Sequence, residues 1–272
     1  MTLVLTCVTE NNLIQVSDRR LTWPDGTHKD VAAKTTSVCG HGLIGYTGLA
    51  MIGAENTGMW FARTARLTKS QPELLDHLKQ GADQTISTLP LPDHIKRLTF
   101  VGAIWIEVEG VLRPFFMGLS NAFGDLSFKR QSEPAPLKNG FSLYAFGAAL
   151  TMGENADIRR DIRRRVAKGD RPAELLELLV RLLRRVSGRT PTVGKAAIGA
   201  SLPRTCIPAR YVRRAGAPDY SKEIFQYFPD GKWDSGEWYG PNLACGGQAI
   251  TDPVSSNKTE DEDWFRKHGG PY

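Results

Sequence analysis

The order of strand and helix patterns along the chain restricts its fold more than any other feature of the sequence. The first two β-rich apolar runs are separated by a turn signal at residues 10–12, and the next two by a glycine-rich turn at 40–42. Such short connections predict antiparallel β-hairpins. A polar loop with a turn at 24–26 is expected between the two hairpins. The four runs cover residues 3–8, 13–16, 35–38 and 43–47.

Helical patterns then appear as two pairs, and strand patterns separate and follow them. Pro72 marks a favoured first-turn position for the second helix of the first pair. The expected helices cover about 50–68, 72–86, 151–167 and 172–187, and the expected strands cover 98–108, 111–119, 141–146 and 195–202. Runs of hairpin strands alternating with helix pairs predict an α+β fold rather than parallel βαβ units.

Composition limits the class of protein. Of the 272 residues, 41% are hydrophobic and 24% are charged, as in ordinary globular proteins. No apolar run reaches the roughly 18 residues that a transmembrane helix needs. The N-terminus has no signal-peptide pattern, so a cytoplasmic location is expected. The four cysteines form no CxxC pair and the five histidines lack ligand spacing, so we expect reduced thiols, no metal site and no cofactor.

Much of the net charge of +6 lies between residues 158 and 189, where ten arginines occur. On a helix pair, such a run is usually a solvated or interface face. A nucleic-acid site is disfavoured because no aromatic interleaving or binding motif accompanies the arginines. Arg19 and Arg20 are interpreted in the same way, as solvated or interface residues, with binding of acidic substrate groups as the alternative.

Thr2, Asp18 and Lys34 form the candidate catalytic group. They are spaced 16 residues apart, at positions where three strand ends can converge. If Met1 is removed, Thr2 carries both a hydroxyl nucleophile and a free α-amine. The amine has an ordinary pKa of about 7.7–8.0 and can accept the hydroxyl proton. A nearby lysine lowers the pKa of that amine, and a carboxylate holds the lysine.

The stretches 2–6, 17–20 and 45–48, with Lys34 between them, resemble the start of a proteasome β subunit. They also resemble the bacterial ATP-dependent peptidases of the same N-terminal-nucleophile (Ntn) hydrolase superfamily. The resemblance is clear over about residues 2–65 and is supported by element order to about 200. It implies a four-layer αββα sandwich and a threonine peptidase or amidase that cleaves amide bonds after Met1 removal.

The resemblance also implies roles for residues and partners. The Gly48 backbone N–H would stabilise the oxyanion of the tetrahedral intermediate. Gly45 and Thr47 are assigned to substrate binding, with strand packing as the alternative for Gly45. The expected partners are a peptide or amide substrate and further copies of the chain, which could form a ring. An ATPase partner is left open, and no membrane partner is expected.

Two segments depart from the family pattern. The family commonly has a serine in the strand that leads into the third helix, where this chain has Ala148. The family has an acid after the fourth helix, where this chain has Arg189, followed by Thr192 as a candidate replacement for a second serine. These departures motivate the alternative of a catalytically silent scaffold or assembly protein with the same fold.

The domain prediction is a core over residues 1–202 and an extension of the same domain over 203–272. The extension is rich in Pro, Gly, Trp and Tyr. It is expected to contribute edge strands and then a flexible, charged tail.

Overall fold

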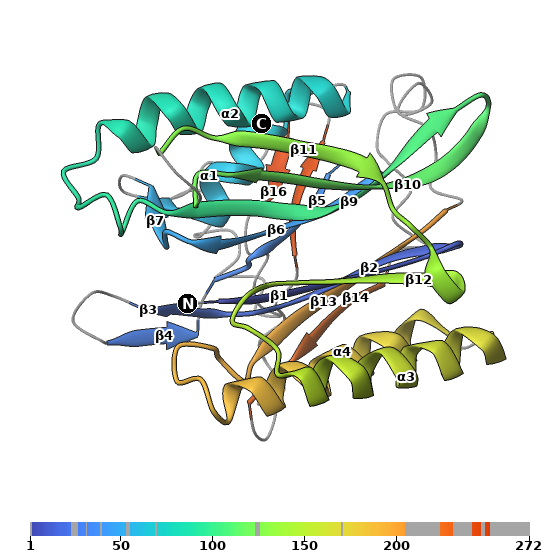
Figure 1. Cartoon of the computed structure of the whole chain (residues 1–272). Coiled ribbons are helices and arrows are strands. Elements are labelled where there is room, and N and C mark those ends of the chain that lie inside the picture. Colours follow the sequence, from blue (N-terminus) through green and yellow to red (C-terminus); the bar gives the residue numbers. More distant parts are fainter. Residues whose placement is uncertain are drawn as a thin grey trace, which may run out of the picture.

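Figure 1 shows the computed structural model of the chain. The structure describes most of the residues between 2 and 250. The helices and strands form two main sheets, two small ribbons and two helix pairs. The described residues are 2–22, 27–30, 32–38, 40–52, 55–68, 70–122, 126–169, 171–204, 224–230, 241–245 and 248–250.

The first main sheet has five strands in the order β12-β1-β2-β13-β14, and every neighbouring pair is antiparallel. The predicted first hairpin forms its centre, with Val4 opposite Ser17. This register places the start of β1 beside the end of β2. The strands are β1 (Leu3–Thr9), β2 (Asn12–Asp18), β12 (Phe141–Gly147), β13 (Ala197–Pro203) and β14 (Ile224–Phe228).

The second main sheet has seven strands in the order β11-β10-β9-β6-β5-β15-β16. Its strands are antiparallel except that β15 runs parallel to β5, with Asn242 opposite Thr36. The strands are β5 (Thr35–Val38), β6 (Gly42–Gly48), β9 (Leu98–Val108), β10 (Val111–Ser120), β11 (Lys129–Pro134), β15 (Asn242–Cys245) and β16 (Gln248–Ile250). Sequence reasoning did not predict β11, because all six of its residues are exposed and mostly polar.

Two short ribbons correct the sequence predictions. Part of the predicted loop over 21–33 forms β3 (Arg20–Thr22) paired with β4 (His28–Asp30). The turn predicted at 24–26 lies outside the described residues. The first helix was predicted to begin near residue 50, but β7 (Met51–Ile52) and β8 (Glu55–Asn56) come first. The Asn56 side chain accepts a hydrogen bond from the Met59 N–H, which fixes the helix start after residue 56.

The helices among the described residues are α1 (Thr57–Ala65), α2 (Gln71–Ser87), α3 (Met152–Lys168) and α4 (Pro172–Ser187), with a short 3₁₀ turn η1 (Lys138–Gly140). Helix α3 starts with a capping box in which Thr151 and Glu154 each bind the other's backbone N–H. It ends at Gly169, which adopts a left-handed conformation with φ 71°. Helix α4 has a strongly apolar face that includes Leu175, Leu179 and Leu183, all buried.

The layers follow from these apolar faces. Helices α1 and α2 lie on the outer face of the seven-stranded sheet, and α3 and α4 lie on the outer face of the five-stranded sheet (Figure 1). Separate apolar clusters fill the two helix–sheet spaces, and smaller clusters around Val4, Leu43 and Trp105 lie between the sheets. The α+β class predicted from the sequence is therefore confirmed.

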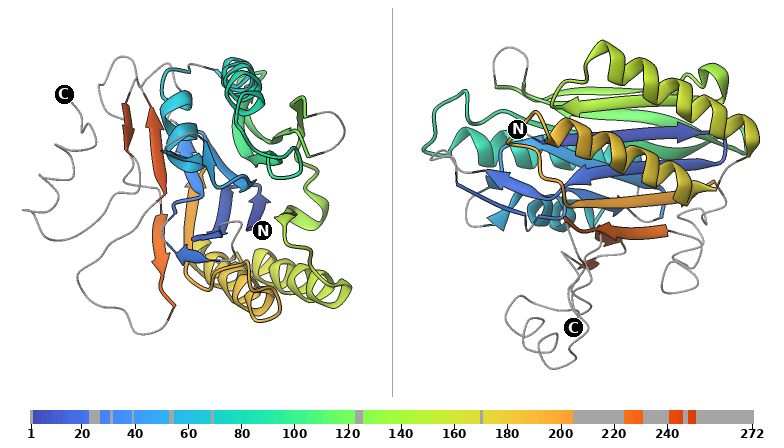
Figure 2. Two further views of the ribbon diagram at one scale, coloured as in Figure 1. Left: turned by 90° about the vertical axis from the view of Figure 1, so that its left-hand side faces the viewer. Right: turned by 90° about the horizontal axis from the view of Figure 1, so that it is seen from below.

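Strands from the carboxy-terminal segment extend both sheets. Strand β14 borders β13, and β15 borders β5, so residues beyond 203 contribute to both layers. Figure 2 shows β14, β15 and β16 along one side of the molecule, in orange and red. The predicted boundary at 202 stays a prediction, and the predicted tail lies outside the described residues.

Candidate active site

The four residues assigned to catalysis lie at strand ends on one side of the molecule. Thr2 immediately precedes β1, and Asp18 is the last residue of β2. Lys34 immediately precedes β5, and Gly48 is the last residue of β6. Since β1 pairs with β2 and β5 pairs with β6, antiparallel pairing brings each strand start to its partner's end.

Lys34 connects Thr2 to Asp18 through hydrogen bonds. The Lys34 Nζ donates to the Thr2 Oγ1 over 2.6 Å and to the Asp18 Oδ2 over 3.0 Å. It also donates to the backbone carbonyl of Arg20. Three acceptors thus match the three protons of an ammonium group. The side chains are enclosed, with exposures of 5% for Thr2, 1% for Lys34 and 0% for Asp18.

The Asp18 carboxylate is fixed mainly by backbone donors. Its Oδ1 accepts from the Leu3 N–H over 2.9 Å. Its Oδ2 accepts from the Arg20 N–H over 3.0 Å and from the Gly194 N–H over 3.2 Å, in addition to Lys34. These bonds tie the carboxylate to β1 and to the loop after α4. Asp18 is therefore a rigid anchor for the Lys34 ammonium.

Burial lowers the pKa of Lys34, because the charged ammonium loses its hydration. The charge of Asp18 and its hydrogen bond oppose this effect, as does the charge of Asp30, whereas Arg20 reinforces it. The balance leaves the pKa of Lys34 below its ordinary value. An amine with this environment is typical of a functional site, although structural ion pairs produce similar shifts.

Arg19 and Arg20 do not have the solvated roles expected from the sequence. Arg19 is only 1% exposed. The Arg20 guanidinium donates to both oxygens of Asp30, over 2.8 and 3.1 Å, and to the Pro191 carbonyl over 2.8 Å. Its backbone carbonyl contacts Lys34 as well. Sequence reasoning missed this supporting role, since charge content alone cannot show a fixed bidentate ion pair.

Gly48 and Thr47 lie near the Thr2 end of the sheets. Gly48 is exposed and has φ 107°, and a Cβ there would approach the Arg97 carbonyl oxygen to 2.2 Å. Only glycine fits this position without strain. Thr47 is half-buried. Its Oγ1 lies 2.8 Å from the position that a Cβ on Gly147 would occupy, and that position is also next to the Thr2 carbonyl.

Gly45 occupies a different environment. It is buried between the sheets, where a Cβ would meet the Val4 Cγ1 at 2.9 Å and the Gln15 Oε1 at 3.0 Å. The Gln15 side chain joins the two sheets, because its Nε2 donates to Thr6 Oγ1 in one and to the Val101 carbonyl in the other. The position of Gly45 favours packing over the predicted substrate contact.

The segment with the missing serine binds Thr2 through its backbone. The Ala148 N–H donates to the Thr2 carbonyl over 2.8 Å. Gly147 has φ 91°, and a Cβ there would lie 1.7 Å from the same carbonyl oxygen. Gly147 is thus required for the close approach of β12 to Thr2, a requirement that residue type alone did not reveal.

Arg189, which stands where the family has an acid, binds an acid from another element. Its guanidinium donates to both Glu154 carboxylate oxygens, over 3.2 and 2.6 Å, and to the Ala149 carbonyl over 2.7 Å. These contacts join the loop after α4 to the start of α3 and to the segment that binds Thr2.

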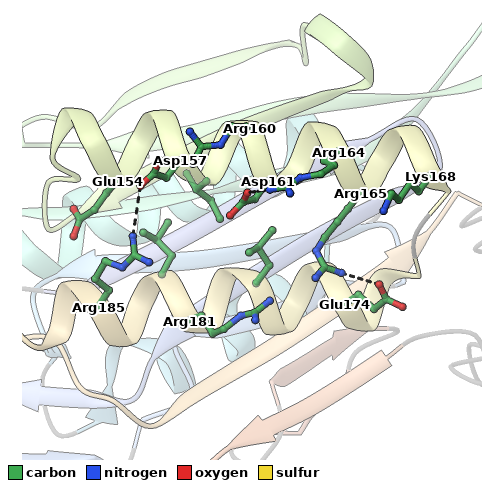
Figure 3. Close-up of a pocket in the computed structure, with 13 residues that line it drawn as sticks. Glu154, Asp157, Arg160, Asp161, Arg164, Arg165, Lys168, Glu174, Arg181 and Arg185 are labelled. Carbon is green, nitrogen blue, oxygen red and sulfur yellow. Dashed lines mark hydrogen bonds and ion pairs between the residues drawn. The ribbon is translucent and has the colours of Figure 1, made fainter.

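The arginine-rich helices α3 and α4 border a separate groove of about 610 Å³, shown in Figure 3. Its cations are largely paired, as in the 2.7 Å contact of Arg165 with Glu174 and the 2.7 Å contact of Arg160 with Asp157. A surface that carries both positive and negative charges does not favour binding of a nucleic-acid phosphate backbone. The charged lining residues are Glu154, Asp157, Arg160, Asp161, Arg164, Arg165, Lys168, Glu174, Arg181 and Arg185.

The described residues contain no group of three or more His, Cys, Asp or Glu side chains arranged to hold a metal ion. No helix among them is long and apolar enough to span a membrane. Cys7 is a buried free thiol whose pKa is raised to about 12 by burial.

Comparison with known proteins corrects the family expectation. No protein-family model and no curated protein sequence matches the chain. An Anbu mutant from Hyphomicrobium sp. strain MC1 is 13% identical, with a TM-score of 0.47 over 75% of this chain and 83% of that one. Anbu (ancestral beta-subunit) from Yersinia bercovieri is 12% identical, with a TM-score of 0.48 over 74% of this chain and 81% of that one. Assignment to the proteasome β-subunit and ATP-dependent peptidase family was therefore wrong, because these Anbu structures are only distant matches.

Proposed function

We propose that the chain is a threonine-type hydrolase that cleaves peptide or other amide bonds once Met1 has been removed. The observation that supports this proposal is the enclosed Lys34 ammonium, which contacts both the Thr2 hydroxyl and the Asp18 carboxylate. A hydroxyl held by a desolvated amine, which is in turn anchored by a third group, is the usual arrangement of an activated nucleophile.

In the proposed reaction, the free α-amine of Thr2 accepts the hydroxyl proton as Oγ1 attacks the substrate carbonyl. The Lys34 ammonium disfavours protonation of that amine beforehand and stabilises the developing charge on Oγ1. The backbone N–H of Gly48 stabilises the oxyanion. The leaving amine takes the proton from the α-ammonium, and an acyl ester remains on Oγ1. Water activated by the α-amine then releases the acid and restores Thr2.

The proposal extends to the fold and the domain organisation. We assign the two facing sheets with outer helix pairs to the four-layer αββα sandwich of the Ntn hydrolases. Residues 1–202 would form its core, and residues 203–272 would extend the same domain. The pairing of β14 with β13 and of β15 with β5 supports a single domain.

We also propose that the chain forms homo-oligomers through the groove between α3 and α4. On each helix the charged residues that line the groove begin with an acid and end with bases, which suits contact with a second copy in the reverse orientation. Light scattering of the Arg181→Glu variant should report fewer subunits than the wild type. An unchanged mass would remove this groove from consideration.

Labelling at Thr2 tests the hydrolase proposal. The purified protein is incubated with a β-lactone, and intact mass and peptide mapping follow the product. Expected results are loss of Met1 and one adduct on Thr2. The Thr2→Ala variant permits the same Met1 removal but should gain no adduct, whereas Thr2→Ser should retain labelling. Retention of Met1, or equal labelling of Thr2→Ala, would contradict the proposal.

The alternative is a catalytically silent scaffold, which Ala148 and Arg189 favour because each stands where a supporting polar group was expected. A Met1-free protein that remains unlabelled, despite an intact Lys34–Thr2 contact in its crystal structure, would support this alternative. Turnover of a peptide library that disappears in Thr2→Ala would exclude it.

A further inference from the structure

The carboxy-terminal strands contact both segments that carry the Lys34–Asp18 pair. Strand β14 lies beside β13, which pairs with β2 and places Ala197 opposite Asp18. Strand β15 lies beside β5, the strand that follows Lys34. Two side chains from these strands reach further, to the residues adjacent to Asp18 and Lys34.

Asn242, at the start of β15, holds the backbone just before Lys34. Its Nδ2 donates to the Ala33 carbonyl over 3.1 Å, and the side chain is 1% exposed. The same carbonyl lies against the α-carbon of Gly58, where a Cβ would approach it to 2.3 Å. Ala33 is thus enclosed between a helix and an amide donor. Residues 32–34 have no regular structure, so such contacts fix their path.

Tyr227, on β14, covers the residue just after Asp18. Its ring centroid lies 5.6 Å from the Arg19 Cζ, a distance typical of a cation–π contact. The Arg19 backbone N–H donates to the Ala196 carbonyl, and its carbonyl accepts from the Ala32 N–H, each over 3.1 Å. Arg19 therefore connects the Asp18 segment to the Lys34 segment, and Tyr227 packs against that connection.

We propose that Asn242 and Tyr227 are positioning residues that set the distance from Lys34 to Thr2 and Asp18, acting through Ala33 and Arg19. This inference rests on the proposed role of Lys34 in the hydrolase. It gives the carboxy-terminal segment a part in the reactive site.

The consequence should be measurable at the Lys34 amine. Its pKa is lowered chiefly by burial, and the charged groups that act on it are Asp18, Asp30 and Arg20. Loss of the Asn242 or Tyr227 contact would loosen residues 32–34 and admit water. The pKa of Lys34 would then rise towards its ordinary value, because the ammonium regains hydration.

The test uses full-length protein with ¹⁵N-labelled lysine, in which the Lys34 signal is assigned through its absence in Lys34→Met. The pH titration midpoint of that signal is compared with the rate of β-lactone labelling. Asn242→Ala and Tyr227→Leu should raise the midpoint and slow labelling by about 10- to 100-fold. Tyr227→Phe, which keeps the ring, and Gln226→Ala, on the same strand, should match the wild type.

Melting temperatures show which variants are folded at the temperature of measurement. Tyr227 is half-buried on an edge strand, so its substitution gives an independent test where Asn242→Ala does not fold. Wild-type midpoints and rates in the folded variants would overturn the inference. A wild-type protein that never labels would defeat the proposed hydrolase, while the Lys34 titration would still decide whether these residues position the amine.

Discussion

Arg189 and Glu154, 35 residues apart, form a two-pronged ion pair at the start of α3. The same carboxylate accepts the N–H of Thr151, so one acidic side chain both caps a helix and binds the loop after α4. The Arg189 guanidinium also donates to the Ala149 carbonyl, and the preceding residue, Ala148, binds the Thr2 carbonyl.

The Arg189–Glu154 pair should make stability depend on acid pH. The hydrogen bond that Glu154 accepts from Arg189 is the main cause of the lowered pKa of Glu154. A depressed pKa in the folded state stabilises the fold above the ordinary value of 4.5, and this contribution is lost as pH falls through the folded value. Urea unfolding of wild type and Glu154→Gln should therefore differ at pH 7, and the difference should disappear as the pH falls through the lowered pKa of Glu154. A constant difference across that range would contradict this expectation.

Removing Lys34 should destabilise the fold strongly, because Asp18 would remain as a buried, uncompensated charge. For Lys34→Met we expect a loss of about 3–5 kcal/mol in the free energy of unfolding. The Lys34→Met/Asp18→Asn double variant should lose less than the sum of the two single variants. Denaturant titration of all four proteins measures this coupling, and additive losses would show that the two groups act independently.

The glycines at 147 and 48 should not tolerate alanine. At both positions φ is positive, and the added Cβ would overlap a backbone carbonyl. We expect each alanine variant to lose more than about 1 kcal/mol. Gly153→Ala is the matched control, since nothing lies within 4 Å of its Cβ position and it lies in α3. That control should be neutral or gain up to about 1 kcal/mol.

The Gly45→Ala variant distinguishes a packing role of Gly45 from a substrate-binding role. The added methyl would press on Val4 and Gln15, so we expect a loss of about 1–3 kcal/mol in folding stability. The same methyl should cost less in a Gln15→Ala background, where one neighbour has been removed. A Gly45→Ala protein with wild-type stability and a raised KM would instead restore the substrate-binding role.

Sequence reasoning could group Thr2, Asp18 and Lys34 because each lies at the end of a strand in a locally specified hairpin. The resemblance suggested that the two hairpins, which belong to different sheets, meet at these ends. Two hairpins place the four strand ends, and each hairpin is specified by nearby apolar runs and turn residues. The finer contacts could not be predicted in this way. The pairing of Asn242 with Thr36 joins residues over 200 positions apart, and no local pattern indicates it. Gly45 and Gly147 look alike in sequence, yet one faces an interior amide and the other a backbone carbonyl.

The parallel pairing of β15 with β5 also determines the order in which neighbouring strands become available during synthesis. Strand β5 lies near the amino terminus, but its neighbour is made only when synthesis has passed residue 242. Closing so long a loop is slow compared with forming the hairpins. On the ribosome, Thr2 and Lys34 emerge long before Asn242, whose side chain binds the Ala33 carbonyl. The residue proposed as the nucleophile is thus synthesised long before the strand that borders the segment after Lys34.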